Sequence, residues 1–342
     1  MDKKHLFIGL FIAGAALYLT FRNVALDELI LSLKSIEYFY LVPAMGLGVL
    51  SFVLRAYRWT FLVSSLKKTS VSRLMAPLCV GFMGNLLPAR AGELIRAYLL
   101  GKKEGISVSA SFATIFVERI FDMLSVLAMA IWLLLFQSGI FDGIAGFGGY
   151  SMIDLLKKFG WLSLALSLGI IIFSYSLVHW NEKMTGIIKV FLRPFPEKPG
   201  SKVLHLVDSF STGLHILKDF KAIAMISLLS LILWFAITFS YYPVYLAFGF
   251  NSLPFSSLVA LTVIVCVFIS LFPTPGFLGS FQIGCVVALH NIFHVPEAQA
   301  ASFGMVTWAV QFGTLIALGS FYLVKEGFSL KQLAHVKDEV DV

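Results

Sequence analysis

The sequence predicts an all-α fold, a polytopic transmembrane bundle of about eight membrane helices plus a re-entrant segment, with two broken-helix elements. Of its 342 residues, 58% are hydrophobic and only 13% are charged, and the mean hydropathy is +0.89. Soluble domains carry about 25% charged residues. Several apolar runs reach the roughly 20 residues that a helix needs to cross a bilayer. Because these runs are continuously apolar rather than alternating, a transmembrane barrel is excluded.

The first apolar run follows two lysines, an arrangement that also begins secretory signal peptides. Its only small-x-small triplet, residues 13–15, lies inside the run, so we expect residues 5–21 to remain as an uncleaved first helix. The later runs predict membrane helices near residues 38–54, 107–136, 159–179, 222–248, 255–272, 277–293 and 298–324. We therefore expect residues 1–342 to form a single integral membrane domain.

One apolar run, residues 74–88, is only 15 residues long and lies between basic segments. This is too short for an ordinary crossing, so we expect the run to enter the membrane and return on the same side. A full crossing would also export Arg96, Lys102 and Lys103. A re-entrant segment keeps them in the cytoplasm, as the positive-inside rule requires.

The distribution of lysine and arginine predicts the orientation. With the N-terminus in the cytoplasm, Arg22, Lys34, Lys157 and Lys158 fall outside, Arg119 falls within the membrane, and the other basic residues face the cytoplasm. The sequence therefore predicts a protein of the cytoplasmic (inner or plasma) membrane with both termini inside. The net charge of +7 follows from this topology, so no nucleic-acid partner is expected.

The largest cytoplasmic connection, residues 180–220, combines Pro194, Pro196 and Pro199 with a following set of apolar residues at helical spacing. This pattern predicts an amphipathic helix at the membrane surface. It is either a connector packed on the bundle or a lipid-sensing element, and the sequence leaves both open.

Two arginines and a tryptophan, Arg55, Arg58 and Trp59, stand at the predicted end of the second helix. Such residues are typical of anchors at the membrane interface. Direct contact with a lipid headgroup is the alternative.

The stretch of residues 85–96 reads N-L-L-P-A-R-A-G-E-L-I-R and combines charges with helix breakers. Pro88 and Gly92 are expected to break the helix, because proline lacks an amide donor and disfavours helix at the residue before it. Irregular backbone at membrane depth needs burial by protein or a lining of water, so the stretch predicts a lined cavity. The candidate substrate-binding residues are Asn85, Arg90, Glu93 and Arg96, with both arginines suited to phosphate. Alternatively, the arginines extend to lipid headgroups at the surface and pair with Glu93.

A second charged group lies inside the apolar run of residues 110–136. Glu118 and Asp122 are four residues apart and share a helix face, and Arg119 is three residues from Asp122. Charges at this depth must face protein or water. We expect either a structural network that also holds the arginines of the first stretch, or direct contact with a transported headgroup.

The third stretch, residues 272–282, reads F-P-T-P-G-F-L-G-S-F-Q. Its breakers Pro273, Pro275, Gly276 and Gly279 predict an interruption between two apolar segments. Paired interruptions in the two halves of a chain indicate the central site of a transporter. Gln282 is the candidate substrate-binding residue here, and a plain turn between two membrane helices is the alternative.

The three stretches, in this order, resemble the flippase-like family represented by the membrane region of lysylphosphatidylglycerol synthases. The resemblance covers nearly the whole chain and rests on Asn85, residues 87–90, Gly92, Glu93, Glu118, Arg119, Asp122, Pro273, Pro275, Gly276 and Gly279. It implies a lipid translocase or lipid-binding protein without the soluble aminoacyl-transferase domain of bifunctional relatives. Many relatives carry glycine and glutamate where this chain has Phe277 and Gln282, which favours a neutral or anionic headgroup.

The leading hypothesis is therefore a lipid translocase that moves a phosphate-bearing amphiphile between leaflets. The expected partners are membrane lipids of the phospholipid or polyprenyl-phosphate type, and no cofactor, metal or catalytic residue is expected. A membrane-embedded transferase using a lipid-linked donor is one alternative. The other is a non-transporting lipid-binding partner of a separate lipid-modifying enzyme. Association with a second copy of the chain is also left open.

Overall fold

The computed structural model describes residues 11, 14–15, 17–18, 20–22, 24–86, 91–141, 151–180, 184–186, 189 and 197–327. All regular secondary structure in these residues is helical. Five helical segments among them are long and apolar enough to cross a membrane. The structure confirms the all-α class and the helical membrane bundle.

The helices fall into long and short groups. The long ones are α3 (Leu41–Val63), α6 (Val108–Phe136), α7 (Met152–His179), α10 (Phe220–Phe239) continued by α11 (Tyr241–Ala247), and α14 (Glu297–Lys325). The shorter ones are α2 (Leu26–Lys34), α4 (Val71–Met83), α5 (Gly92–Glu104), α9 (Glu197–Gly213), α12 (Phe255–Leu271) and α13 (Ser280–Val286). Single turns include η2 (Gly84–Leu86), η6 (Pro275–Phe277) and the π-helical η7 (Val287–Ile292).

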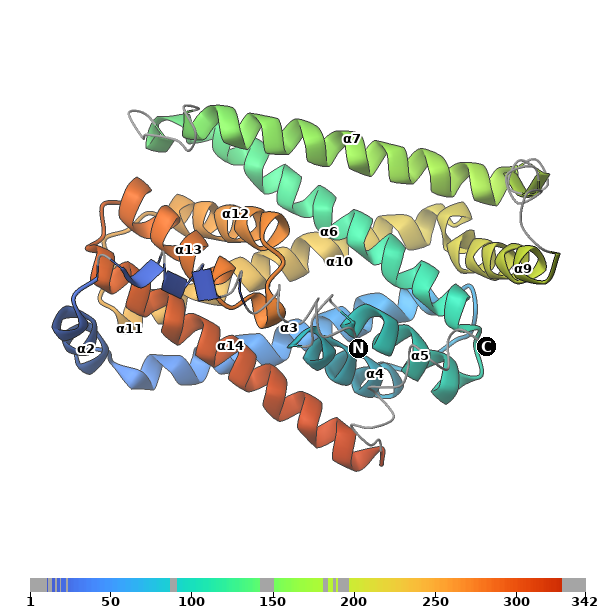
Figure 1. Cartoon of the computed structure of the whole chain (residues 1–342), viewed down its shortest axis with the longest axis horizontal. Helices are drawn as coiled ribbons and strands as arrows, with labels where there is room; N and C mark the ends of the chain where they lie inside the picture. Colours follow the sequence, from blue (N-terminus) through green and yellow to red (C-terminus); the bar gives the residue numbers. More distant parts are fainter. Residues whose placement is uncertain are drawn as a thin grey trace.

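The order of a long helix, a hairpin of two short helices and a second long helix occurs twice in the chain (Figure 1). The first set is α3, α4–α5 and α6, and the second is α10, α12–α13 and α14. The sets run in opposite directions, because α3 leads from the α2 end of the bundle to the α9 end and α10 leads back beside it. Helices α7 and α9 lie between the two sets in the chain. This is the arrangement of an inverted repeat.

The first hairpin is held by close contact between α4 and α5. A Cβ atom on Gly81 of α4 would lie 2.6 Å from the Cβ of Arg96 of α5, so only glycine permits this approach. At the open end of the hairpin, Glu104 forms ion pairs with Lys67 at 3.1 Å and Arg73 at 3.3 Å. The beginning of α4 therefore lies beside the end of α5. The chain thus reverses its direction between α4 and α5, as a re-entrant segment requires.

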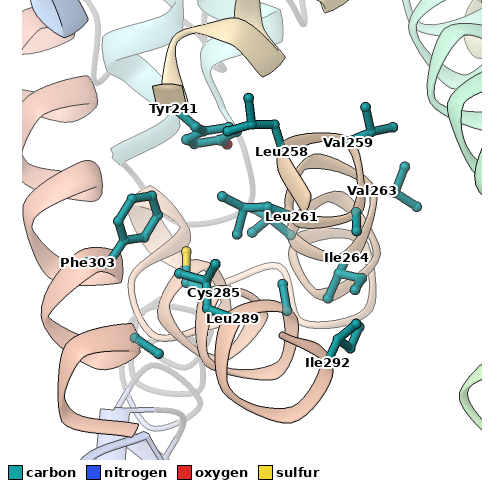
Figure 2. Close-up of a cluster of buried hydrophobic side chains, with 14 of the residues drawn as sticks. Tyr241, Leu258, Val259, Leu261, Val263, Ile264, Cys285, Leu289, Ile292 and Phe303 are labelled. Atoms are coloured by element: carbon teal, nitrogen blue, oxygen red, sulfur yellow. The ribbon is translucent and has the colours of Figure 1, made fainter. Parts of the chain in front are cut away.

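The second hairpin contributes most of the main apolar core, together with α11 and α14 (Figure 2). Its helices also meet through glycine, since a Cβ on Gly284 would lie 2.9 Å from the Cα of Val265. Leu261, Cys285 and Phe303 are fully buried in the core. Because lipid tails are as apolar as these side chains, the association of these helices depends on such close packing.

Most helices lie within a few residues of their predicted positions. The exceptions are α3, which continues to Val63 beyond the predicted end at residue 54, and α7, which begins at Met152 rather than at residue 159. The segment predicted at 222–248 is divided at Ser240. The predicted amphipathic helix is α9, and it packs along α6 as a connector on the bundle would. Of the predicted first helix, the described residues from 11 to 21 are helical.

Candidate functional site

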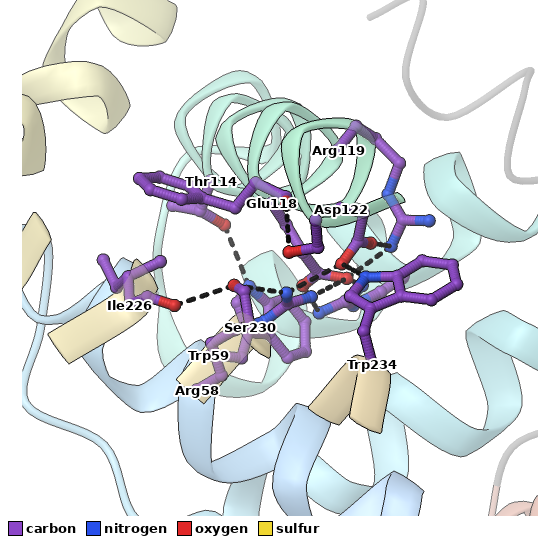
Figure 3. A network of polar contacts seen from close by, with 12 residues as sticks. Arg58, Trp59, Thr114, Glu118, Arg119, Asp122, Ile226, Ser230 and Trp234 are labelled. Atoms are coloured by element: carbon purple, nitrogen blue, oxygen red, sulfur yellow. Dashed lines mark hydrogen bonds and ion pairs between the residues drawn. The ribbon is translucent and has the colours of Figure 1, made fainter. Parts of the chain in front are cut away.

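Charged side chains from α3, α5 and α6 meet inside the bundle (Figure 3). Glu118 of α6 is at the centre. The guanidinium of Arg96 donates to both of its carboxylate oxygens, with N–O distances of 2.9 and 2.6 Å. Nη2 of Arg58 lies 3.4 Å from Oε1 of Glu118, and Arg119 also forms an ion pair with this carboxylate. One carboxylate thus contacts three guanidinium groups.

Asp122 lies one helical turn beyond Glu118 and faces the same side of α6. Its Oδ1 accepts hydrogen bonds from Nη1 of Arg58 at 2.7 Å and from the indole of Trp234 at 3.1 Å. Its Oδ2 lies 3.2 Å from Nη2 of Arg119. Arg58, Arg96, Glu118, Arg119 and Asp122 together are called the ion-pair network below. It brings Glu118, Arg119 and Asp122 together with Arg96 of the first stretch and also includes Arg58 of α3.

Neighbouring side chains fix the arginines of the network. Arg96 lies over the Trp59 ring, with its Cζ 3.7 Å from the ring centroid. The Trp59 indole in turn donates to the hydroxyl of Thr114 at 3.0 Å. Arg58 also donates to the hydroxyl of Ser230 of α10 at 2.8 Å. Charges inside a membrane protein persist where they have partners of opposite charge and further favourable contacts, which Ser230 provides for Arg58 and Trp59 provides for Arg96.

The network has a buried centre and an accessible edge. The side chains of Arg58, Arg96 and Glu118 are 0–2% exposed, whereas those of Arg119 and Glu93 are 35% and 36% exposed. Nε of Arg119 lies 3.7 Å from Oε1 of Glu93, and this pair forms the edge. A ligand could reach Arg119 without displacing any part of the centre.

The described residues of the predicted first break lie at the tip of the first hairpin or beside it. Asn85 lies in η2, and Gly92 begins α5. A Cβ on Gly92 would lie 2.1 Å from the carbonyl oxygen of Gly81 and 2.4 Å from Oδ1 of Asn85, so this position requires glycine. Arg90 and Pro88 lie outside the described residues. The helix ends in η2 next to Pro88, in agreement with the predicted break.

The second break is also present, and all its predicted breakers lie between α12 and α13. Pro273 follows the end of α12, and Pro275 begins η6. Gly276 and Gly279 have φ of 58° and 88°, a region that favours glycine. Phe277 shares this conformation with φ of 57°.

Gln282 is 1% exposed, and its Oε1 accepts a hydrogen bond of 2.7 Å from the amide of Gly279. It therefore caps the first turn of α13.

The tips of the two hairpins touch. Turns η2 and η6 pack on each other, and a Cβ on Gly276 would lie 2.9 Å from Cδ2 of Leu86. The indole of Trp308 of α14 donates to the carbonyl of Gly276 at 2.8 Å, and its ring stacks on Phe312. The two breaks predicted as a pair are therefore adjacent in space.

The interpretation of Arg58 and Trp59 as interfacial anchors was wrong. Helix α3 continues beyond them, and both side chains are fully buried, with Arg58 in the ion-pair network. The carboxylates that neutralise Arg58 come from α6, far away in the sequence. The sequence offered one signal of a further cationic partner: α6 carries two carboxylates but only one arginine within one turn.

Trp308→Phe is expected to lower the free energy of unfolding by about 1–2 kcal/mol, because it leaves the Gly276 carbonyl without its indole donor. The phenyl ring retains the stacking on Phe312. Denaturant unfolding of the purified protein in detergent measures the effect. Trp161→Phe is the control, because Trp161 is 72% exposed on the outer surface of α7. Equal losses in the two variants would contradict a role for this hydrogen bond.

No group of three or more histidine, cysteine, aspartate and glutamate side chains in the described part of the chain could hold a metal ion. The charges of the site are arranged in guanidinium–carboxylate pairs instead. Such an arrangement can exchange one carboxylate for a phosphate, which presents similar acceptor oxygens to the planar fork of arginine.

Comparison with known proteins gives one family and several relatives. The family model described as Lysylphosphatidylglycerol synthase TM region matches residues 6–319. A UPF0104 membrane protein of Methanothermobacter thermautotrophicus is 26% identical in an alignment of 290 residues that covers 81% of this chain and 79% of that protein. The glycosyltransferase AglD of Haloferax volcanii is 30% identical over 124 residues, which are 36% of this chain but 20% of that protein. No solved structure matches the chain significantly.

Proposed function

This chain belongs to the family of lysylphosphatidylglycerol synthase transmembrane regions, and we propose that it moves a phosphate-bearing amphiphilic lipid between the leaflets of its membrane. One observation carries the proposal: a charged network lies inside the bundle, beside the meeting point of two hairpin tips. Charges at membrane depth are expensive and are associated with pathways for polar substrates. A structural ion pair alone would not need an accessible edge.

The inverted arrangement of the two halves supports transport. Transporters built from inverted repeats bind substrate where discontinuous helices meet near the midplane, and alternate access by moving one repeat against the other. Here the hairpins enter from opposite ends and meet at η2 and η6. In our proposal the touching tips form the barrier between the two sides. The Pro and Gly residues of the breaks allow the tips to separate.

The accessible edge of the network is the proposed headgroup site. Arg119 binds the lipid phosphate, and Glu93 is the partner that the phosphate replaces. Arg96 was predicted from the sequence as a phosphate contact, but its side chain is 2% exposed and is paired with Glu118. In our proposal Arg96 and Arg58 position the carboxylates that hold Arg119. Arg90 remains a phosphate contact proposed from the sequence alone.

The predicted orientation indicates which side of the membrane each hairpin opens to. If both termini face the cytoplasm, the open end of the α4–α5 hairpin, with Lys67 and Arg73, lies at the cytoplasmic surface. The α12–α13 hairpin then opens to the other side. We propose this arrangement for a cytoplasmic membrane.

Arg119→Gln is expected to slow leaflet exchange at least about tenfold, because a charged hydrogen bond to phosphate is lost. The purified protein is reconstituted in vesicles, and the movement of labelled lipids between leaflets is followed. Arg73→Gln removes the same charge from a side chain that is 61% exposed at the hairpin's open end, and exchange should persist. The thermal stability of both variants is measured in parallel, so that unfolding is not mistaken for loss of transport.

Exchange by the wild-type protein equal to that of protein-free vesicles, across phospholipid and polyprenyl-phosphate lipids, would overturn the proposal. The similarity to part of a protein named a glycosyltransferase then favours a second function. In that case the chain binds a lipid for a separate enzyme, and Arg119→Gln impairs lipid retention or complex formation although no lipid moves.

A further inference from the structure

The charges around the network do not balance within the described residues. Arg58, Arg96 and Arg119 are joined by a fourth arginine, Arg55, one turn before Arg58 on α3. The carboxylates that face them are Glu93, Glu118 and Asp122. Four guanidinium groups thus meet three carboxylates. A surplus positive charge inside a membrane protein is unfavourable unless an anion or water accompanies it.

Arg55 carries this surplus. No carboxylate oxygen of a described residue lies within the 4.0 Å of an ion pair with it, whereas Arg58 has two such partners. Arg55 is only partly buried, and its Cζ lies 5.0 Å from the centroid of the Phe82 ring at the tip of the first hairpin. The Cζ of Arg119 lies 6.0 Å from the same centroid. Two accessible arginines therefore share one aromatic ring.

The position of Arg55 connects the two halves of the bundle. Arg55 on α3 and Arg119 on α6 both lie over the Phe82 ring at the tip of the first hairpin, and α12 of the second hairpin packs on α6. The space around Arg55 is thus bordered by α3, α6 and the tip of the first hairpin, with the second hairpin packed on α6. This is the place where a headgroup would stand between the two repeats.

An apolar cavity is lined by Trp234, the hydrogen-bond donor to Asp122. Its volume is about 260 Å³, and α6, α10 and α12 line it. Ser125 and Thr238 are the hydroxyl-bearing residues of its lining. Phe235 and Phe255 also line it and are 59% and 48% exposed, so the cavity is open to the surroundings of the bundle. A cationic site that continues into an open apolar cavity fits an amphiphile better than a free ion.

We propose that Arg55 and Arg119 together bind the phosphate of a lipid with one net negative charge, whose hydrocarbon chain lies in the cavity lined by Trp234. The inference rests on the proposed function and specifies its substrate class. One negative charge neutralises the surplus guanidinium. Arg58 and Arg96 add to the positive electrostatic potential at this site, but their guanidinium groups are already paired with Asp122 and Glu118.

Lipid binding by the purified full-length protein in detergent tests the proposal, with native mass spectrometry as the readout. The probes are phosphatidylglycerol, with one net negative charge, phosphatidylcholine, whose phosphate charge is offset by its choline, and inorganic phosphate as competitor. Wild type should prefer phosphatidylglycerol, and Arg55→Gln should weaken that binding about tenfold or more and remove most of the preference over phosphatidylcholine. Arg55→Lys should recover part of the affinity, since it keeps the charge but loses the fork. Arg73→Gln is the matched control and should bind as wild type.

Unchanged phosphatidylglycerol binding in a folded Arg55→Gln variant would overturn the proposal. So would inorganic phosphate that binds as tightly as the lipid, because the cavity would then contribute nothing. Phe235→Ser changes the cavity lining without touching the ion-pair network. It should weaken the binding of phosphatidylglycerol and leave the binding of inorganic phosphate unchanged. Failure of the proposed function gives a different result. If lipid binding depends on Arg55 but no leaflet exchange occurs, transport is refuted and the binding site is retained.

Discussion

Glu118→Gln is expected to lower the free energy of unfolding by about 3–5 kcal/mol, the range for removing one member of a buried ion pair. The amide has nearly the same shape as the carboxylate, so packing is preserved while the charge is lost. Arg96 then loses its bidentate partner, and Arg58 and Arg119 keep only Asp122 as a close buried carboxylate. Denaturant unfolding in detergent, followed by tryptophan fluorescence, measures the loss.

Glu93→Gln provides the matched comparison, because it removes the same charge from the accessible edge. The Glu93 side chain is 36% exposed and lies 3.7 Å from Arg119, so its removal should cost less than about 1 kcal/mol. Equal losses for the two variants would show that burial does not set the strength of the network. A stable Glu118→Gln protein would mean that water or lipid replaces the carboxylate.

The membrane made much of this fold predictable. A chain that must satisfy its backbone inside a bilayer is restricted to helices, so apolar runs directly predict them. Helix α6 was predicted at 107–136 and observed at Val108–Phe136. The two breaks were predictable for the related reason that proline and glycine interrupt helices wherever they gather. Their contact at η2 and η6 was inferred only from the general architecture of transporters.

The partners of Arg58 show where prediction from the sequence stops. Helical spacing identifies residues that share a face, but it does not identify the helix that this face meets. Arg58 lies 64 residues from Asp122 and 172 from Ser230, and contacts both. At the end of an apolar run, an arginine destined for the bundle interior has the same local pattern as one at the lipid interface. Only the tertiary packing of α3, α6 and α10 separates these cases.

The close contact between α4 and α5 in the first hairpin could not be predicted from the sequence either. The sequence predicts that Gly92 breaks a helix, yet in the structure Gly92 is the first residue of the regular helix α5. Its importance comes from α4, because the carbonyl of Gly81 occupies the space where a side chain would begin. A glycine chosen for close packing and a glycine chosen for backbone freedom look alike in a single sequence.

Gly92→Ala is therefore expected to lower the free energy of unfolding by about 3 kcal/mol, the upper part of the range for overpacking. The added Cβ would lie 2.1 Å from the carbonyl oxygen of Gly81, and backbone on a neighbouring helix cannot move aside as a side chain can. The two helices must separate, which also displaces Arg96 from Glu118. Unfolding in detergent measures the first effect, and leaflet exchange in vesicles measures the second.

Gly46→Ala on α3 separates this clash from the general effect of replacing glycine in a helix. Nothing lies within 4 Å of a Cβ at Gly46, so alanine should stabilise the helix by up to about 1 kcal/mol. The two substitutions add the same methyl group and should have opposite signs. If Gly92→Ala were also stabilising, α4 and α5 could not be as close in the membrane as the hairpin requires. The contact between η2 and η6 would then depend on something other than the close packing of α4 on α5.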